Sequence, residues 1–369
     1  MLGNMIKHDH FSPVTEELGL EATGSESNTV KLDNNAEMNS IDTAGVEDLM
    51  DAIEEVKPCW TKPSPKNQPS NGFVTFSLTM GPEYHISQIT DAVVVARYLG
   101  ATLVLPDIRG NELGNKRKFQ DMYNVDKFVR RLDGVVEVID EIPDEVSAKK
   151  PAVIRVPNRV TESFITDTIQ PIFQKNKYLR LAVIFSSVSL RPKETSNKDL
   201  DATACLAMFS GLELKHEYSE VARKMLDRLQ ELSKKSDGKV LAIDLRTDLL
   251  EKKSCKTTRG ARRKGCYNPD EYIFVFLQDD IMPAEDKGEF LKSSNADLAR
   301  ALDLEICSQS DVFIPAVAGL FYGHVTGKRI ASGRTQIIVP SQSSTSTHAS
   351  DFISTYISNK NHIAYSCYC

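Results

Sequence analysis

The chain has 369 residues, of which 41% are hydrophobic and 26% are charged, and its formal net charge is −6 at pH 7. This length predicts about two domains, each with its own apolar core. The acidic charge argues against nucleic acid as the main partner, because contacts with phosphates need a basic surface. No stretch reaches the ~18–20 apolar residues that span a bilayer, and the first residues lack the pattern of a secretory signal, so we expect a soluble form.

Residues 1–70 differ in composition from the rest of the chain. Segment 21–45 is rich in Ser, Asn, Thr and acidic residues without a sustained period, and three prolines lie between Cys59 and Gly72. Such a composition predicts a disordered stem or linker. We expect folded structure to begin near Gly72.

Strands and helices alternate in the next part of the chain. FVTFSL (73–78) predicts a strand, and residues 81–106 predict a turn, an apolar helix and a second strand. A helix leading into the strand 135–139 follows, then a helix over 162–176 that breaks near Pro171, and a strand over 179–185. Amphipathic helices are expected over 201–214 and 216–235.

A second α/β unit is predicted to begin near Asp237. VLAIDLR (240–246) predicts a buried strand, because its apolar run is almost continuous. The same patterns predict strands over 270–277, 311–316 and 335–340 and helices over 295–309, 319–331 and 348–360. We therefore predict two Rossmann-like α/β domains with parallel sheets, residues 71–236 and 237–345, followed by a C-terminal helix and tail over 346–369. A cleft at the carboxyl ends of their strands is the expected ligand site.

The start of the first long helix carries the first candidate site residues. Glu83 and His85 lie where this helix begins, and a helix N-terminus with its free N–H groups attracts anions. Gly81 would let a ligand approach the backbone closely. The alternative is that Glu83 complements the helix dipole and His85 is a solvated turn residue.

The strand 240–246 ends in Asp244, Leu245 and Arg246, with Asp248 two residues further on. The guanidinium group of Arg246 has the geometry to bind a diphosphate. The alternative is an Asp–Arg ion pair on the surface, which contributes little to stability.

The turn after the strand 311–316 is rich in small residues. Ser310 and Asp311 precede this strand, and Ala316, Ala318 and Gly319 lie between it and the following helix. Small residues at a helix start permit close approach of a phosphate or a base, and equally permit close packing of a helix on a sheet.

Cys255 and Cys266 bracket a strongly basic segment. A disulfide between them would close a short loop, and the alternative is two reduced thiols. The segment 252–264 has the charge to attract a nucleotide, an acidic polysaccharide or RNA, or it is a solvated loop. The chain contains no P-loop, GxSxG or HExxH motif, and we expect no metal site.

Long stretches of the sequence resemble a known family. The order of segments 91–106, 240–246, 267–271 and 310–329 resembles the plant O-fucosyltransferase-like family. Within this family, the amino-acid sequences of segments 75–111, 194–215 and 303–333 resemble those of the mannan synthesis-related proteins. The resemblance covers about residues 57–369.

This resemblance implies a GT-B-like glycosyltransferase of the Golgi. It implies transfer of a sugar from a nucleotide diphosphate, GDP-linked, to a cell-wall polysaccharide such as mannan, without a metal. Arg246 matches the arginine of the family's His-x-Arg motif, which holds the diphosphate, and Ser310 and Asp311 fall where the family contacts its nucleotide. Glu83, His85 and Asp248 are the candidates for the catalytic base.

The sequence also departs from the family pattern. Asp244 replaces the histidine of His-x-Arg, and Gly81-Pro82-Glu83-Tyr84-His85 replaces a Gly-Gly-x-Asn-Gln loop. Family members begin with a membrane anchor, which residues 1–56 lack, and one βα unit of the second domain is expected to be absent between residues 272 and 279. These departures leave open a second hypothesis, in which the protein is a non-catalytic scaffold that assists a polysaccharide synthase.

Overall fold

The computed structural model describes residues 56–65, 69–109, 116–193, 197–234, 238–244, 278–290, 296–315, 318–339 and 353–369. These residues belong to one compact unit. It contains parts of both predicted α/β domains, and the boundary near residue 237 stays a prediction. None of the helices in this described part has the length and apolar character needed to cross a membrane.

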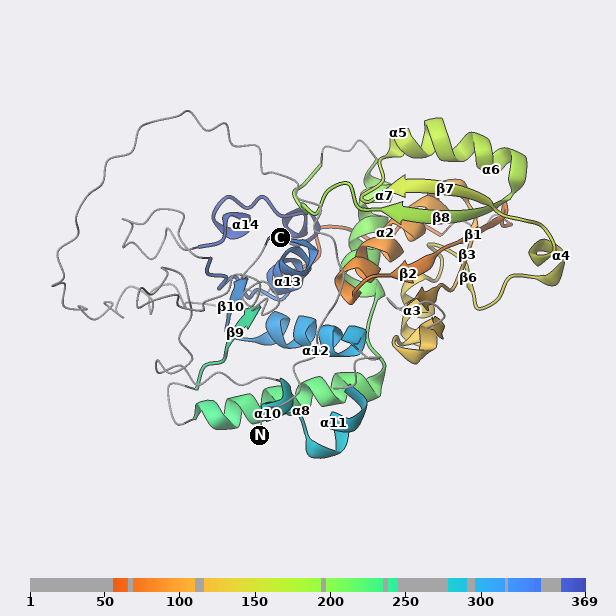
Figure 1. The fold of residues 1–369 in the computed structure, drawn as a ribbon. Coiled ribbons are helices and arrows are strands. Elements are labelled where there is room, and N and C mark those ends of the chain that lie inside the picture. Colours follow the sequence, from red (N-terminus) through yellow and green to blue (C-terminus); the bar gives the residue numbers. More distant parts are fainter. Residues whose placement is uncertain are drawn as a thin grey trace, which may run out of the picture. The chain divides into compact units, whose positions relative to one another are not determined.

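The first half of the chain forms the predicted parallel sheet. Five strands pair in the order β6-β3-β1-β8-β7, and each neighbouring pair is parallel (Figure 1). The strands are β1 (Phe73–Thr75), β3 (Thr102–Val104), β6 (Val138–Ile139), β7 (Ala152–Pro157) and β8 (Tyr178–Ile184). Because all five run in the same direction, their carboxyl ends lie at one edge of the sheet.

The predicted strand 73–78 is two short strands in different sheets. After β1 the chain passes through the buried Phe76 and continues as β2 (Ser77–Thr79). β2 pairs with β4 (Asp107–Arg109), which pairs in turn with β5 (Lys116–Lys118). The sequence pattern cannot show this change of sheet, because buried and less buried side chains keep alternating from β1 into β2.

Helix α2 (Pro82–Leu99) is almost fully buried. Pro82 lies in its first turn, where a missing N–H costs nothing, and Gly100 ends it in the left-handed conformation with φ of 61°. α2 packs against β1, β3 and α7 (Lys198–Leu206) in the first half, and against α12 (Ala296–Gln309) and α13 (Leu320–Ala331) in the second. It is therefore the central helix of the described unit.

The helix predicted over 162–176 changes its winding before Pro171 instead of breaking. It begins as α5 (Glu162–Phe164), continues as a π-helical turn over Ile165–Ile169 and ends as α6 (Gln170–Asn176). Pro171 has no N–H to donate to the preceding turn, which accounts for the wider winding there. A second π-helical turn, Ala207–Gly211, follows α7.

The remaining elements of the first half are helical. They are a 3-10 turn over Phe119–Asp121, α3 (Val125–Leu132), α4 (Asp144–Ser147) and α8 (His216–Ser233). Val221 and Met225 of α8 are buried, as the predicted amphipathic pattern requires.

The second half contains a smaller parallel arrangement. β9 (Leu241–Asp244) pairs in parallel with β10 (Val312–Pro315), and Phe313 bridges to Ile337 in the same sense. The expectation that β9 is buried was wrong, since Leu241 is 46% exposed. Among the described residues β10 is its only partner strand.

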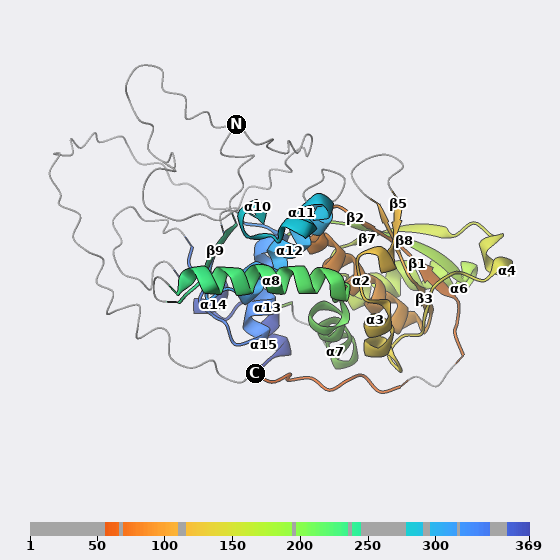
Figure 2. The same ribbon diagram turned by 90° about the horizontal axis from the view of Figure 1, so that it is seen from below.

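Helices complete the second half. α12 packs against α8 and α13 as well as α2 (Figure 2). The predicted final helix is much shorter than expected, because Ile353 bridges to Ile338 and helical winding begins only at Thr355. The other helices are α10 (Gln278–Ile281), α11 (Ala284–Phe290), α14 (Thr355–Ser358) and α15 (Ala364–Cys367).

One apolar core joins the two halves. Ile89 and Val93 of α2 belong to the same cluster of buried side chains as Leu298, Ala301 and Leu302 of α12. Each of these side chains is at most 4% exposed. The two α/β units are thus connected through packed side chains along these helices.

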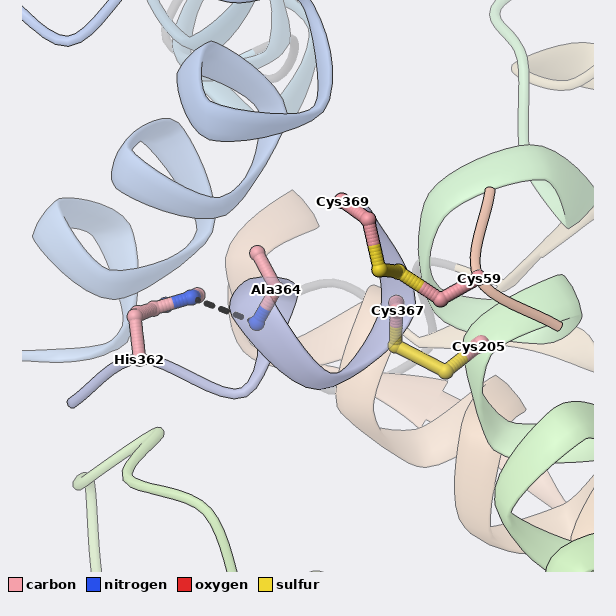
Figure 3. Close-up of a disulfide and its surroundings, with 6 residues drawn as sticks. All are labelled: Cys59, Cys205, His362, Ala364, Cys367 and Cys369. Carbon is pink, nitrogen blue, oxygen red and sulfur yellow. Dashed lines mark hydrogen bonds between the residues drawn. A yellow bond between two sulfur atoms is a disulfide. The ribbon is translucent and has the colours of Figure 1, made fainter. Parts of the chain in front are cut away.

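Two disulfides fasten the C-terminal segment, Cys59–Cys369 and Cys205–Cys367 (Figure 3). Backbone hydrogen bonds join Lys57 to Cys369 in both directions, at 3.1 and 2.9 Å. Residues 56–65, which the composition assigns to a stem, are therefore tied to the folded unit. The sequence separations of 310 and 162 residues explain why spacing did not reveal these pairs. The predicted pair Cys255 and Cys266 lies outside the described residues.

Candidate active site

Arg300 brings together two carboxylates from different elements. Its Nη1 lies 3.0 Å from Oδ1 of Asp244 at the carboxyl end of β9, and its Nε lies 3.8 Å from Oε1 of Glu83 in the first turn of α2. The guanidinium carbon lies 3.5 Å from the centre of the Phe321 ring of α13, a cation–π contact. The start of α2 and the end of β9, both expected at the ligand site, thus meet through α12.

The environment of Glu83 suits a group that accepts a proton. Its side chain is 13% exposed, and Oε2 has no hydrogen-bond partner among the described residues. Burial raises the pKa of Glu83, and the positive charge of Arg300 opposes that shift. A carboxylate that is partly desolvated is a stronger base than one in water, and this is a common property of catalytic carboxylates.

Gly81 leaves room for the side chain of Glu83. A Cβ atom on Gly81 would lie 2.6 Å from Oε2 of Glu83. The carboxyl group of Glu83 therefore folds back over the glycine that precedes α2. The expectation that Gly81 lets a ligand approach the backbone closely stays a prediction.

His85 is fully buried, so its interpretation as a solvated turn residue was wrong. Its Nδ1 lies 2.7 Å from the hydroxyl oxygen of Tyr123, and the two rings meet edge to face. Burial lowers the pKa of His85 to about 3, and the charge of Arg117 acts in the same direction. The imidazole is thus neutral at physiological pH, and its weak basicity makes it less suited than Glu83 to act as a base.

Ser310 and Asp311 lie at the amino end of β10, and their contact with a nucleotide stays a prediction. They precede the strand, whereas ligands bind beyond the carboxyl ends of strands in such sheets. Arg329, fully buried, donates to the carbonyl oxygens of both residues at 2.6 and 2.8 Å. Oδ2 of Asp311 accepts the N–H of Val240 at 2.7 Å. These contacts give both residues a role in holding β9, β10 and α13 together.

Gly319 lies at the expected end of the second parallel arrangement. It is the N-cap residue of α13, which follows the carboxyl end of β10. No described heavy atom lies within 4 Å of the position that a Cβ would take. Within the described part of the chain, the space beside Gly319 is therefore open, and its role in binding a nucleotide stays a prediction.

α13 also contacts the start of α2 directly. Nε2 of His324 lies 3.0 Å from the hydroxyl of Ser87, and both side chains are buried. The two helix starts that carry Gly319 and Glu83 are thereby fixed to each other.

Arg246, Asp248 and Ala316 lie outside the described residues, and their roles stay predictions. Arg300 and Phe321, in contrast, were not identified from the sequence. A signal for Arg300 was present, because it shares a helical face with the buried Leu304 and Cys307 at intervals of four and seven residues. A cation on an apolar helical face points to a buried partner.

Replacing Arg300 with methionine is expected to lower the free energy of unfolding by about 2–3 kcal/mol near neutral pH. The substitution leaves the buried carboxylates of Glu83 and Asp244 without their cation. The loss should shrink as the pH falls toward 4.5, the ordinary pKa of a glutamate, because a protonated Glu83 needs no counter-charge. Denaturant unfolding at several pH values measures both effects.

Arg223 provides the matched control for this experiment. It also contacts two carboxylates, Glu220 and Asp227, but its side chain is 57% exposed. Arg223→Met should leave the unfolding midpoint nearly unchanged, because water screens such pairs. Equal losses from the two substitutions would contradict the importance of the Arg300 contacts.

Comparisons with known proteins identify the family. The family model for GDP-fucose protein O-fucosyltransferase matches residues 84–266. The whole chain is 43% identical to Protein MANNAN SYNTHESIS-RELATED 1 of Arabidopsis thaliana, covering 96% of it. It is 37% identical to Protein MANNAN SYNTHESIS-RELATED of Trigonella foenum-graecum, covering 95% of that protein. Among solved structures, POFUT1 in complex with GDP aligns with 74% of this chain and 99% of that one, at 13% identity and a TM-score of 0.35.

The resemblance seen in the sequence is thus confirmed at the level of the family. With two relatives matched along the whole chain and a family model matched over residues 84–266, the chain belongs to the mannan synthesis-related proteins of the O-fucosyltransferase family.

Proposed function

We propose that this protein transfers a sugar from a nucleotide diphosphate donor, GDP-linked, to a cell-wall polysaccharide such as mannan. The observation that carries the proposal is the pair of contacts that Arg300 makes with Glu83 and Asp244. It brings a buried carboxyl group with a raised pKa to the end of the strand that leads into Arg246. The relatives' names and the family model support the reaction class and the polysaccharide. In this proposal the two α/β halves form a GT-B-like arrangement.

The proposed reaction is a direct displacement at the anomeric carbon. Glu83 takes the proton from an acceptor hydroxyl, whose oxygen forms the new bond to the anomeric carbon. The bond from that carbon to the diphosphate breaks, and its electron pair leaves with the nucleotide. Arg246 and the backbone N–H groups at the start of α13, beside Gly319, stabilise the charge that develops there. Cationic side chains and N–H groups then serve in place of a metal.

The two disulfides support residence in an oxidising compartment. Cys59–Cys369 and Cys205–Cys367 persist where thiols are not kept reduced, as in the secretory pathway. Nucleotide sugars and polysaccharide acceptors would meet in the lumen of the Golgi. The proposal therefore places the reaction there.

Nucleotide binding tests the proposal most directly. Calorimetric titration with GDP, GDP-fucose, GDP-mannose and the corresponding UDP compounds, in the presence of a chelator, should show saturable binding of a GDP compound. Arg246→Ala should weaken that binding at least about tenfold, because it removes a charge-assisted contact. Arg130→Ala, which changes an exposed arginine of α3, should bind as the parent protein does. Undiminished binding by Arg246→Ala would exclude its role.

A second candidate function is a non-catalytic scaffold that assists a polysaccharide synthase. The observation favouring it is that Asp244, at the position of the family's histidine, is already engaged by Arg300 at 3.0 Å. A folded protein that binds none of these nucleotides would support the scaffold.

A further inference from the structure

An uncharged and partly apolar surface follows strand β8. Segment 184–190 reads Ile-Phe-Ser-Ser-Val-Ser-Leu and contains no charged side chain. Ile184 is 46% exposed and Val188 is 43% exposed, and Ser186 and Ser187 are also exposed. Single exposed apolar side chains are ordinary on protein surfaces, so the neighbours of these residues decide whether they belong to a binding surface.

An aromatic pair joins this segment to the start of α2. The rings of Tyr84 and Phe185 meet edge to face with their centres 4.7 Å apart, and both residues are half-buried. Tyr84 follows Glu83 directly in the chain, so the pair lies at the same helix start as the proposed base.

The surface is held in place by buried polar groups. Oδ1 of Asn158, itself 4% exposed, accepts the N–H groups of Ser186 and Ser187 at 3.2 and 3.4 Å. Asp91 of α2 accepts the N–H groups of Arg159 and Val160 at 3.0 and 2.9 Å. The turns after β7 and β8 are therefore fixed to each other and to α2. Such a surface loses little conformational entropy when it binds a ligand.

We propose that Tyr84, Phe185, Ser186, Ser187 and Val188 form a subsite for the pyranose rings of a neutral polysaccharide. The C–H faces of a hexose pack on aromatic and apolar side chains, while serine hydroxyls bond to its hydroxyl groups. No side chain of segment 184–190 is charged, but Arg159 donates to the carbonyl oxygen of Ser189 at 3.0 Å and the exposed Arg191 follows the segment, so a charged polymer is the necessary comparison in the test. The inference rests on the proposed function, because it names the site of the acceptor.

Binding of mannohexaose, measured by calorimetry, tests this subsite, with an oligogalacturonate of equal length as the charged comparison. Phe185→Ala should weaken mannohexaose binding about tenfold. Phe185→Leu keeps an apolar side chain without the ring and should also bind more weakly, while its thermal midpoint stays close to that of the parent protein. Val188→Ser should weaken binding as well.

Val129 of α3 provides the matched control, because it is 37% exposed, close to the value for Val188, and because α3 lies apart from β8 in both ribbon views (Figures 1 and 2). Val129→Ser should bind mannohexaose as the parent protein does. Equal affinities across all variants, no binding by the parent protein, or preference for the oligogalacturonate would each overturn the subsite.

GDP binding, measured on the same samples, separates the two proposals. Binding of GDP without mannohexaose would overturn the subsite and leave the donor site intact. Binding of mannohexaose that depends on Phe185, by a protein that binds no nucleotide, would support the subsite and overturn the transferase. Every variant of the subsite should retain the GDP affinity of the parent protein.

Discussion

Replacing Glu83 with glutamine is expected to lower kcat about a thousandfold while leaving GDP binding unchanged. Glutamine has almost the same shape but cannot accept the proton of the acceptor hydroxyl. The parent protein should also show kcat/KM rising with pH through the raised pKa of Glu83, because only the deprotonated carboxyl is a base. Glu83→Gln should lose that acidic limb. Initial rates over a pH series measure both properties.

Arg300 gives this experiment a second readout. Its charge holds the pKa of Glu83 down against the effect of burial. In Arg300→Met the acidic limb should therefore move to higher pH. A limb that stays in place would show that another group controls the profile.

Glu305 offers a control for the loss of a half-buried, ion-paired carboxylate. Its Oε2 pairs with Nζ of Lys328 at 3.0 Å, and this pairing lowers its pKa. Glu305→Gln should cost stability through the loss of that pair but leave kcat unchanged. If both glutamine variants lose activity alike, the effect on Glu83 is structural and the catalytic assignment fails.

Removal of the Cys205–Cys367 disulfide is expected to lower the free energy of unfolding by about 4 kcal/mol. The bridge joins residues 162 positions apart, so it removes much of the conformational entropy of the unfolded chain. Chemical denaturation of Cys205→Ala/Cys367→Ala measures the loss. A reductant should lower the unfolding midpoint of the parent protein by more, because Cys59–Cys369 opens too.

A protein in which all four of these cysteines are alanine provides the control. The reductant should affect its stability only through a bridge between Cys255 and Cys266. No response would show that this predicted pair is reduced, and a clear response would show that it is oxidised. If the reductant leaves the unfolding midpoint of the parent protein unchanged, the structural role of the two observed bridges is contradicted.

Local patterns predicted most of the helices and parallel strands. Pro82 and Gly100 bound α2 for reasons that act within one turn, and its apolar residues continue between them. The division of 73–78 into β1 and β2 was missed, because it depends on strands that lie elsewhere in the sequence. The exposure of Leu241 was missed for the same reason, since an apolar run does not reveal how many neighbours a strand has.

The candidate site was predicted in part. Glu83 and the strand end at Asp244 were placed at the ligand site, and the structure brings them together. The partner that joins them, Arg300, lies in a helix where the sequence showed only a cation among apolar residues. Ser310 and Asp311 were assigned to the nucleotide site from resemblance. In the structure they precede β10, and their hydrogen bonds hold the elements around that strand together. Sequence patterns place residues on elements, but which groups meet across elements depends on tertiary packing.

The shared core of α2 and α12 restricts how substrates reach the site. A hinge motion that separated these helices would expose Ile89, Leu298 and Leu302, which are 0%, 4% and 0% exposed. Each such side chain costs roughly 1.5–3 kcal/mol to transfer to water. Opening of the two halves as rigid bodies would therefore cost several kcal/mol. For the proposed reaction we expect entry and release of substrates to depend on movement of the turns at the strand ends, with the helices between the halves staying packed.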